Sequence, residues 1–366
     1  MDCFNTIIRS LQLQQLDLLQ VFNKARERNE ECIILITHSF CMAKRFYLLI
    51  GVFVLLSATV IGQAQDSGTF RIVGYFSLQA AMTKDFKQVP FDKLTHINLY
   101  FLNPDSLGNY AYDFSKLAPF LKAAHDKNVK VLASIGGGGP HPYYAWLLKD
   151  SSRKRLVNDL LSIVLKSGLD GIDVDLEGGD IDENYDNLVM ELAVELHAHQ
   201  KLITAATAVF YKDAVTNRAL TQFDFLNVMS YDHTGSWAPE KPGPHATYSH
   251  AVDDLSYFRV IRGIPKDKLT LGVPFYGYGF GPTLTTPGIS MNYRDIVSKF
   301  TGAESADQLD MGDGKTLYYN GIPTIKMKTV LAKAEASGIM IWQISADAEG
   351  PKSLLNAIHE AAAENE

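Results

Sequence analysis

Short apolar runs alternate with helical patterns along the chain from residue 71 to residue 344. The runs are rich in β-branched and aromatic residues and are bounded by turn residues, which is typical of buried strands. Eight stretches fit this description: 71–77, 94–101, 129–135, 170–176, 202–209, 223–230, 269–276 and 338–344. The sequence therefore predicts eight strands.

Helical patterns fill the gaps between these strands. Apolar residues recur at helical spacing in 113–127, 150–168, 183–200 and 326–338, and the first two stretches begin with Asp or Ser caps. The last stretch ends at Gly338, which we interpret as a helix stop. Strands alternating with helices over about 280 residues predict an α/β fold, the (β/α)8 TIM barrel. A doubly wound open sheet is the alternative, but it needs a glycine-rich turn after the first strand, which GYFSLQA lacks.

The longest gap between predicted strands is the stretch 277–337. It holds the segments GFGPTLTTPG and MGDGKTLYYNG and one clear helix. We interpret it as a short excursion between strand 7 and helix 7, and not as a separate domain.

Four acidic residues alternate with aliphatic ones in the segment DGIDVDLEGG, residues 170–179. Residues two apart on a strand share a face, so Asp173, Asp175 and Glu177 point the same way. In a barrel this face looks inward, and the aliphatic residues between them face the helices. Asp170 has the opposite parity, and we expect it to have a structural role at the strand start.

Glu177 is the best candidate for a general acid among these residues. Same-face carboxylates about 6.5–7 Å apart repel one another, and this raises at least one apparent pKa. A raised carboxyl pKa suits an acid that works near neutral pH. Glu177 is last on the strand, at the rim where barrel active sites lie, and has the longest reach.

Two binding-loop interpretations fit the sequence less well. DVDLEG is similar to the start of an EF-hand loop, but position 12 would be Asn184 instead of Glu, and the interleaved aliphatics require a buried strand. The glycine run at 136–139 lacks the Lys and Ser/Thr partners of a phosphate loop. We therefore expect neither a metal nor a cofactor.

A signal-peptide pattern begins at Met42. Lys44 and Arg45 precede an apolar run that ends at Ile61, and residues 62–64 offer small side chains for cleavage. We expect 1–41 to be an over-extended gene call or a disordered tail, 42–64 to be the signal peptide, and 65–366 to be the secreted, extracellular or periplasmic, catalytic barrel. An uncleaved anchor is the alternative, but 16 apolar residues fall short of the about 20 that a bilayer span needs.

Composition agrees with an exported domain. We expect a monomer that has no membrane contact in its mature form. All three cysteines precede Met42, so the mature chain would depend on its core and not on disulfides. The net charge of −7 argues against a nucleic-acid partner. A neutral ligand is compatible with it.

The acidic strand resembles the D-x-x-D-x-D-x-E signature of glycoside hydrolase family 18, the chitinases and endo-β-N-acetylglucosaminidases. SIGG at 134–137 and NVMSYD at 227–232 look like the family's S-x-G-G and M-x-Y-D segments, on its third and sixth strands. THINLYF, LGVPFYG and GIMIWQI are similar to its second, seventh and last strands. The resemblance spans about residues 70–350 and implies the same barrel.

The resemblance also implies roles for individual residues. Glu177 would be the acid/base, Asp175 would orient the substrate's N-acetyl group, and Asp173 would stand behind it. Tyr231 would hydrogen-bond the acetamido carbonyl, and Trp342 would form the floor of the −1 sugar site. The other residues expected at the site are Met229, Asp232, Tyr75, Phe101, Gly137 and Tyr276, with Trp237 at a rim subsite.

The chain departs from the commonest family pattern on both sides of Glu177. Many chitinases have an aromatic before the acid and a tyrosine after it, where this chain has Leu176 and Gly178. The excursion also looks too short for the complete α+β insertion of processive members. We expect a more open cleft and endo-acting cleavage.

The resemblance implies a secreted chitinase that hydrolyses β-1,4-linked N-acetylglucosamine with retention, in chitin or in chitooligosaccharides. The family uses the substrate's own acetamido oxygen as nucleophile, so one catalytic Glu suffices. An endo-β-N-acetylglucosaminidase acting on N-glycan cores is the alternative within the same class. A non-catalytic lectin is the alternative outside it, but such lectins commonly lose the glutamate that is present here.

Overall fold

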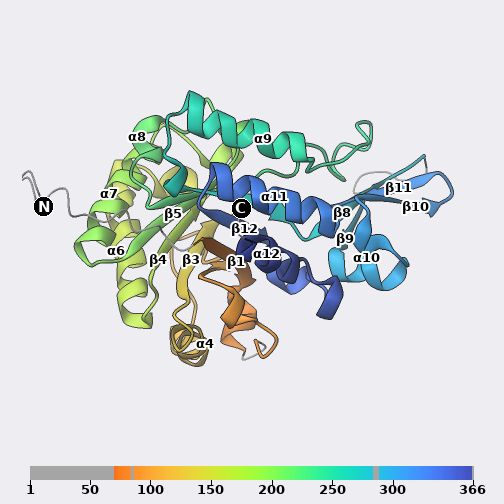
Figure 1. Ribbon diagram of the computed structural model, residues 1–366. Coiled ribbons are helices and arrows are strands. Elements are labelled where there is room, and N and C mark those ends of the chain that lie inside the picture. The colour runs from red at the N-terminus through yellow and green to blue at the C-terminus, as the bar shows by residue number, and fades with distance from the viewer. Residues whose placement is uncertain (1–69, 84–85, 283–287, 365–366) are drawn as a thin grey trace, which may run out of the picture. The chain divides into compact units, whose positions relative to one another are not determined.

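The computed structural model describes residues 70–83, 86–282 and 288–364. Within them, parallel strands close into a barrel, which confirms the predicted fold class (Figure 1). Around the barrel the order is β1 (Arg71–Ser77), β12 (Gly338–Trp342), β7 (Leu269–Pro274), β6 (Phe225–Val228), β5 (Leu202–Thr207), β4 (Gly171–Asp175), β3 (Lys130–Gly136) and β2 (His96–Tyr100). Each predicted strand has its counterpart, with ends that differ by a few residues.

Helices follow the strands and cover the outside of the barrel. They are α3 (Leu78–Met82), α4 (Ala118–His125), α5 (Tyr144–Leu147), α6 (Asp150–Ser167), α7 (Tyr185–Ala198), α8 (Asn217–Leu220), α9 (Tyr248–Ser256), α11 (Ile322–Glu335) and α12 (Leu354–Ala363). Helices α6 and α7 contact each other and the strands β4 and β5 (Figure 1).

Strand β4 has the two faces that its sequence predicts. Ile172, Val174 and Leu176 are buried in the apolar layer between strands and helices. Asp173 and Asp175 alternate with them and are also buried. Burying aliphatic side chains contributes about 1.5–3 kcal/mol each, which fixes the register and forces the carboxylates inward.

The interpretation of Gly338 as a helix stop is wrong. Helix α11 ends at Glu335, and Gly338 is the first residue of β12. Gly338 pairs with Arg71 in parallel register, and an added Cβ would lie 2.3 Å from the Arg71 carbonyl oxygen. Glycine is required here because the two backbones approach closely.

The excursion after β7 is more structured than the sequence indicated. It forms an antiparallel sheet in the order β10 (Gln308–Gly312), β11 (Lys315–Tyr318), β8 (Tyr276–Phe280) and β9 (Ile289–Asn292), with α10 (Tyr293–Lys299) beside β9 (Figure 1). A tight turn joins β10 to β11, with Asp313 at φ 55° and Gly314 at φ 70°. Asp-Gly is a strong hairpin signal, so the MGDGK segment could have revealed this pair.

The predicted signal peptide at 42–64, and the stretch 1–41 before it, lie outside the described residues. Among the residues that are described, no helix has both the length and the apolar character needed to cross a bilayer.

Candidate active site

Asp173 lies at the centre of a polar cluster inside the barrel and has no exposed surface. Its carboxylate accepts hydrogen bonds from Tyr75 (2.6 Å), Ser134 (2.7 Å), Thr204 (2.6 Å) and Asn227 (3.3 Å). Burial raises its pKa, and these four donors oppose the rise. Asp173 is thus rigidly held and turned away from solvent, as a supporting group would be.

Asp175 is the next inward residue and is only 3% exposed. Its Oδ1 atom is buried and has no hydrogen-bond partner among the described residues. Burial raises its pKa well above the usual value, and the charges of Glu177 and Asp173 add to the rise. An unpaired buried carboxylate oxygen is costly, so this site is suited to a ligand that brings an N–H or O–H donor.

Glu177 follows β4 at the C-terminal rim, with an extended backbone. The Tyr211 hydroxyl, just after β5, donates to its Oε2 at 2.7 Å. Burial raises the pKa of Glu177, the Tyr211 hydrogen bond lowers it, and Asp232 and Asp180 raise it further. The carboxyl group is therefore biased towards the protonated form that a general acid needs.

A group of aromatic rings adjoins the carboxylates through Tyr75, which donates to Asp173. The Trp342 ring lies 5.3 Å from Tyr75, 5.0 Å from Tyr100 and 5.9 Å from Phe101, between ring centroids. Gly137 has φ +99°, and a Cβ there would lie 2.3 Å from the Phe101 ring. Glycine therefore lets the β3 loop pass beside Phe101. Such a surface is suited to stacking against the apolar face of a ring-shaped ligand.

Tyr231 and Met229 lie after β6, against the inner face of the barrel. Tyr231 is buried among the inner apolar residues, with Met229 and Trp342 packed against them. Its hydroxyl has one weak contact, to the Met340 sulfur at 3.8 Å. A stronger acceptor, such as a ligand carbonyl, would replace that contact.

Asp232 is held by residues from the excursion and from its own loop. Tyr276 donates to its Oδ1 at 2.5 Å and Tyr278 to its Oδ2 at 3.4 Å, and the His245 Nδ1 lies 3.2 Å from Oδ1. Trp237 packs edge-on against Tyr278 at 5.4 Å between centroids and is 53% exposed. This loop thus carries both a half-buried carboxylate and an aromatic at the rim.

The structure brings the predicted site residues into one connected group. Sequence reasoning missed three that belong with them, namely Tyr211, Tyr278 and His245. A weak signal existed for Tyr211, since it follows a predicted strand at the C-terminal end. Within the described ranges, there is no group of three or more His, Cys, Asp or Glu side chains that could hold a metal ion.

A large cavity lies away from these residues. It has a volume of ≈ 1160 Å³ and lies between residues 86–93, α10 and residues 344–356. None of the carboxylates or aromatics described above lines it. The carboxylates and aromatic residues described above, and not this cavity, therefore identify the candidate site.

Comparisons with known proteins agree with this fold. The sequence model of "Glycosyl hydrolases family 18" matches residues 71–347. Endochitinase 1 of Metarhizium robertsii is 26% identical over 300 residues, which are 69% of each chain. A GH18 chitinase from the chitin utilization locus of Flavobacterium johnsoniae has a TM-score of 0.71 and 33% identity, covering 80% of this chain and 94% of its own. A chitinase from Bacteroides thetaiotaomicron has a TM-score of 0.68 and 27% identity, covering 81% and 98%.

Proposed function

The chain belongs to family 18 of the glycosyl hydrolases, and we propose that it hydrolyses β-1,4 bonds between N-acetylglucosamine units of chitin or chitooligosaccharides. The observation that carries this proposal is the unpaired buried oxygen of Asp175 between a supported Asp173 and a rim Glu177. An acetamido N–H supplies the missing donor. A sugar without an N-acetyl group would leave that oxygen unpaired.

Glu177 is proposed to protonate the glycosidic oxygen. Its raised pKa keeps a proton available near neutral pH. After the bond breaks, the resulting carboxylate takes a proton from water as that water attacks. One residue thus serves both steps, and a second carboxylate at the distance of a classical nucleophile is not needed.

The acetamido oxygen of the substrate is proposed to be the nucleophile at the anomeric carbon. A positively charged, oxazolinium-type ring then develops beside Asp175, and its carboxylate stabilises the charge in a buried setting. Tyr231 donates to the same acetamido group and holds it in line. Two successive displacements at one carbon give retention of configuration.

The aromatic surface around Trp342 is proposed to hold the −1 sugar, with Met229, Asp232, Tyr75, Phe101, Gly137 and Tyr276 around it. Trp237, exposed beside Tyr278, is suited to a further sugar at the rim. After Glu177 the chain turns through Gly178 at φ +53°, so no bulky side chain follows the acid. This small residue supports the open cleft expected of an endo-acting enzyme.

Incubation with chitotetraose and, separately, with a high-mannose glycoprotein tests the proposed substrate. We expect cleavage of chitotetraose to shorter oligomers and an unchanged glycoprotein. Release of intact glycans would instead support an endo-β-N-acetylglucosaminidase. Binding of chitotetraose with no cleavage of either substrate would support a lectin.

Tyr211→Phe is expected to move the alkaline limb of the kcat/KM profile to higher pH. The Tyr211 hydroxyl stabilises the ionised form of Glu177, so its removal raises the pKa of Glu177 further, and the acid keeps its proton at higher pH. At the optimum, kcat should fall only about two- to tenfold, the net value of one hydrogen bond. A pH–rate series with chitotetraose measures both effects.

Tyr110→Phe is the matched control for that variant. The Tyr110 hydroxyl is buried and has no hydrogen-bond partner among the described residues, so the substitution removes an oxygen and no bond. Its pH profile should coincide with the wild type. An alkaline limb of Tyr211→Phe that stays in place or moves to lower pH would contradict the assigned role.

Export through the segment 42–64 is also part of the proposal. N-terminal sequencing of protein recovered outside the cell is expected to begin near Gln65. A product that retains 42–64 would contradict it.

A further inference from the structure

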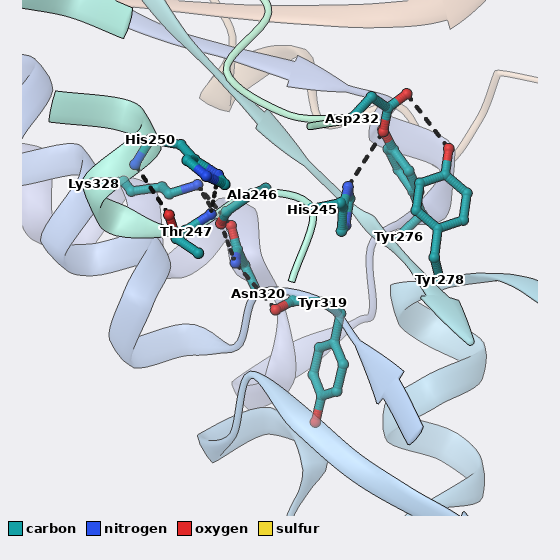
Figure 2. Close-up of polar contacts among 10 residues, drawn as sticks. All are labelled: Asp232, His245, Ala246, Thr247, His250, Tyr276, Tyr278, Tyr319, Asn320 and Lys328. Carbon is teal, nitrogen blue, oxygen red and sulfur yellow. Dashed lines mark hydrogen bonds and ion pairs between the residues drawn. The ribbon is translucent and has the colours of Figure 1, made fainter. Parts of the chain in front are cut away.

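A fully buried lysine lies behind the site and has no part in the proposed chemistry. Lys328 of α11 is 0% exposed. Its Nζ atom donates to the Ala246 carbonyl and to the Asn320 Oδ1, both at 2.9 Å (Figure 2). Lysines are almost never fully buried without partners. We therefore examine which groups these two hydrogen bonds hold in place.

The two partners of Lys328 converge on one peptide group. The Asn320 Nδ2 donates to the same Ala246 carbonyl at 2.8 Å and to the Tyr319 carbonyl at 3.1 Å. The Ala246 oxygen thus accepts from two side chains, which come from α11 and from the turn before it. Ala246 is itself buried, so this peptide group has a fixed orientation.

Ala246 directly follows His245, which contacts Asp232. The His245 side chain is 1% exposed, and its ring lies 5.1 Å from Tyr276 and 4.9 Å from Tyr278 between centroids. Its Nδ1 faces the Asp232 carboxylate at 3.2 Å (Figure 2). Any shift of residue 246 therefore moves the imidazole relative to the carboxylate and both tyrosines.

The chain on either side of His245 and Ala246 is anchored as well. The His233 N–H donates to the His245 carbonyl at 3.1 Å. Thr247 caps α9 by accepting from the His250 N–H at 3.0 Å. Asp232 has φ 63°, a conformation that costs free energy for a non-glycine residue and persists only where the surroundings enforce it. Lys328 and Asn320 anchor the same loop at the Ala246 carbonyl, from another part of the chain.

We propose that Lys328 is a positioning residue for the sugar site, which fixes the Ala246 carbonyl together with Asn320 and thereby sets the His245 imidazole that orients Asp232. Helix α11 is in this way coupled to catalysis, although Lys328 itself does not touch the substrate. The inference rests on the proposed function, because Asp232 is there assigned to the −1 sugar.

The hydrogen bonds of Lys328 do not depend on its charge. Burial lowers its pKa to about 7, while the charges of Asp307 and Asp254 oppose the change. The other titratable group that it influences is His250 of α9. A neutral amine still has two N–H donors, and Lys328 has two acceptors. The positioning role should therefore persist on both sides of its pKa.

A double-mutant cycle on kcat/KM for chitotetraose tests the proposal. Lys328→Met keeps the length of the side chain and removes its donors, and we expect it to lower kcat/KM about tenfold, within the range of networked residues. Asp232→Asn should also lower kcat/KM. In the Asp232→Asn background, Lys328→Met should cost less than about twofold, because its effect passes through Asp232.

Full additivity of the two losses, or an unchanged kcat/KM in Lys328→Met, would overturn the proposal. Lys326→Met on the same helix is the matched control, since Lys326 is paired with Glu360 at the surface, and it should leave kcat/KM unchanged. If Lys328→Met does not fold, Asn320→Ser enters the same cycle, with the same outcomes expected.

A readout without substrate separates this proposal from the proposed function. NMR of the His245 Nδ1 proton should show a protected signal in the wild type and in Lys326→Met. Lys328→Met should lose the signal or speed its exchange with water. An unaltered signal contradicts the positioning role even if chitotetraose is cleaved, and a lost signal supports it even if another substrate is the right one.

Discussion

Glu177→Gln is expected to lower kcat for chitotetraose by a factor of about 10²–10⁴, the usual contribution of a general acid. Glutamine keeps the shape of the side chain and can accept the Tyr211 hydrogen bond, but it has no proton to give to the leaving oxygen. Binding should survive, because the aromatic surface around Trp342 is unchanged. Steady-state rates and a titration of tryptophan fluorescence with chitotetraose measure the two effects.

Glu195→Gln on α7 is the matched control for this variant. It makes the same chemical change on a helix outside the barrel and should leave both kcat and binding at the wild-type level. Retention of more than about a tenth of wild-type kcat in Glu177→Gln would refute its role as the acid.

Asp175→Asn should lower kcat by about 10²–10³ and change binding much less. The substitution removes the carboxyl group whose ionised form is proposed to stabilise the oxazolinium-type ring, and such electrostatic groups contribute about 2.7–4 kcal/mol. An asparagine can still meet the acetamido group, so the ground-state complex should form. Single-turnover rates at saturating chitotetraose isolate this step from binding.

Asp170→Asn is the control within the same strand segment. Asp170 accepts from the Val131 N–H at 2.9 Å and from His125 at 2.8 Å, and these bonds, with Lys130, lower its pKa. A carboxyl group whose pKa is lowered by folding stabilises the fold fully above the unfolded-state pKa of about 4, and this contribution is lost as pH falls through the lower folded-state pKa. Asp170→Asn should therefore lower Tm at pH 7 and leave kcat unchanged. Equal losses of kcat in both variants would contradict a special role for Asp175.

The barrel and the carboxylate face were predictable from sequence because one periodicity governs both. Ile172 and Val174 of β4 pack against the helices. Because successive side chains of a strand point to opposite faces, Asp173 and Asp175 must then point into the barrel. The same argument separated Asp170 from the inward carboxylates. The structure agrees with it, since Asp170 bonds to the neighbouring strand at the outer layer.

The excursion was harder to predict because its strands are short and half-exposed. Strands β10 and β11 have few buried residues, so they show little of the apolar contrast that marks the barrel strands. The sheet nevertheless brings Tyr276 and Tyr278 to Asp232. A contact between segments so far apart in the sequence depends on tertiary packing and not on any local pattern.

Lys328 shows what a charge-based interpretation misses. In KMKTVLAKAEASG it is one of several lysines and is typical of a solvated face. In the structure it shares a stripe with Ile325, Thr329 and Ala332, all buried, at the spacing of one helix face. The stripe could have been read from the sequence, but its polar partners Asn320 and Ala246 could not.

The stereochemistry of chitotetraose hydrolysis tests the central claim most directly. Time-resolved ¹H NMR of the wild-type reaction should show the new reducing end first as the β-anomer, which then relaxes towards the equilibrium mixture. This result is expected if the acetamido oxygen is the nucleophile, so that the anomeric configuration is retained, and if Glu177 is the only proton donor. An initial α-anomer would mean direct attack by water with inversion, and would contradict the roles assigned to Asp175 and Glu177.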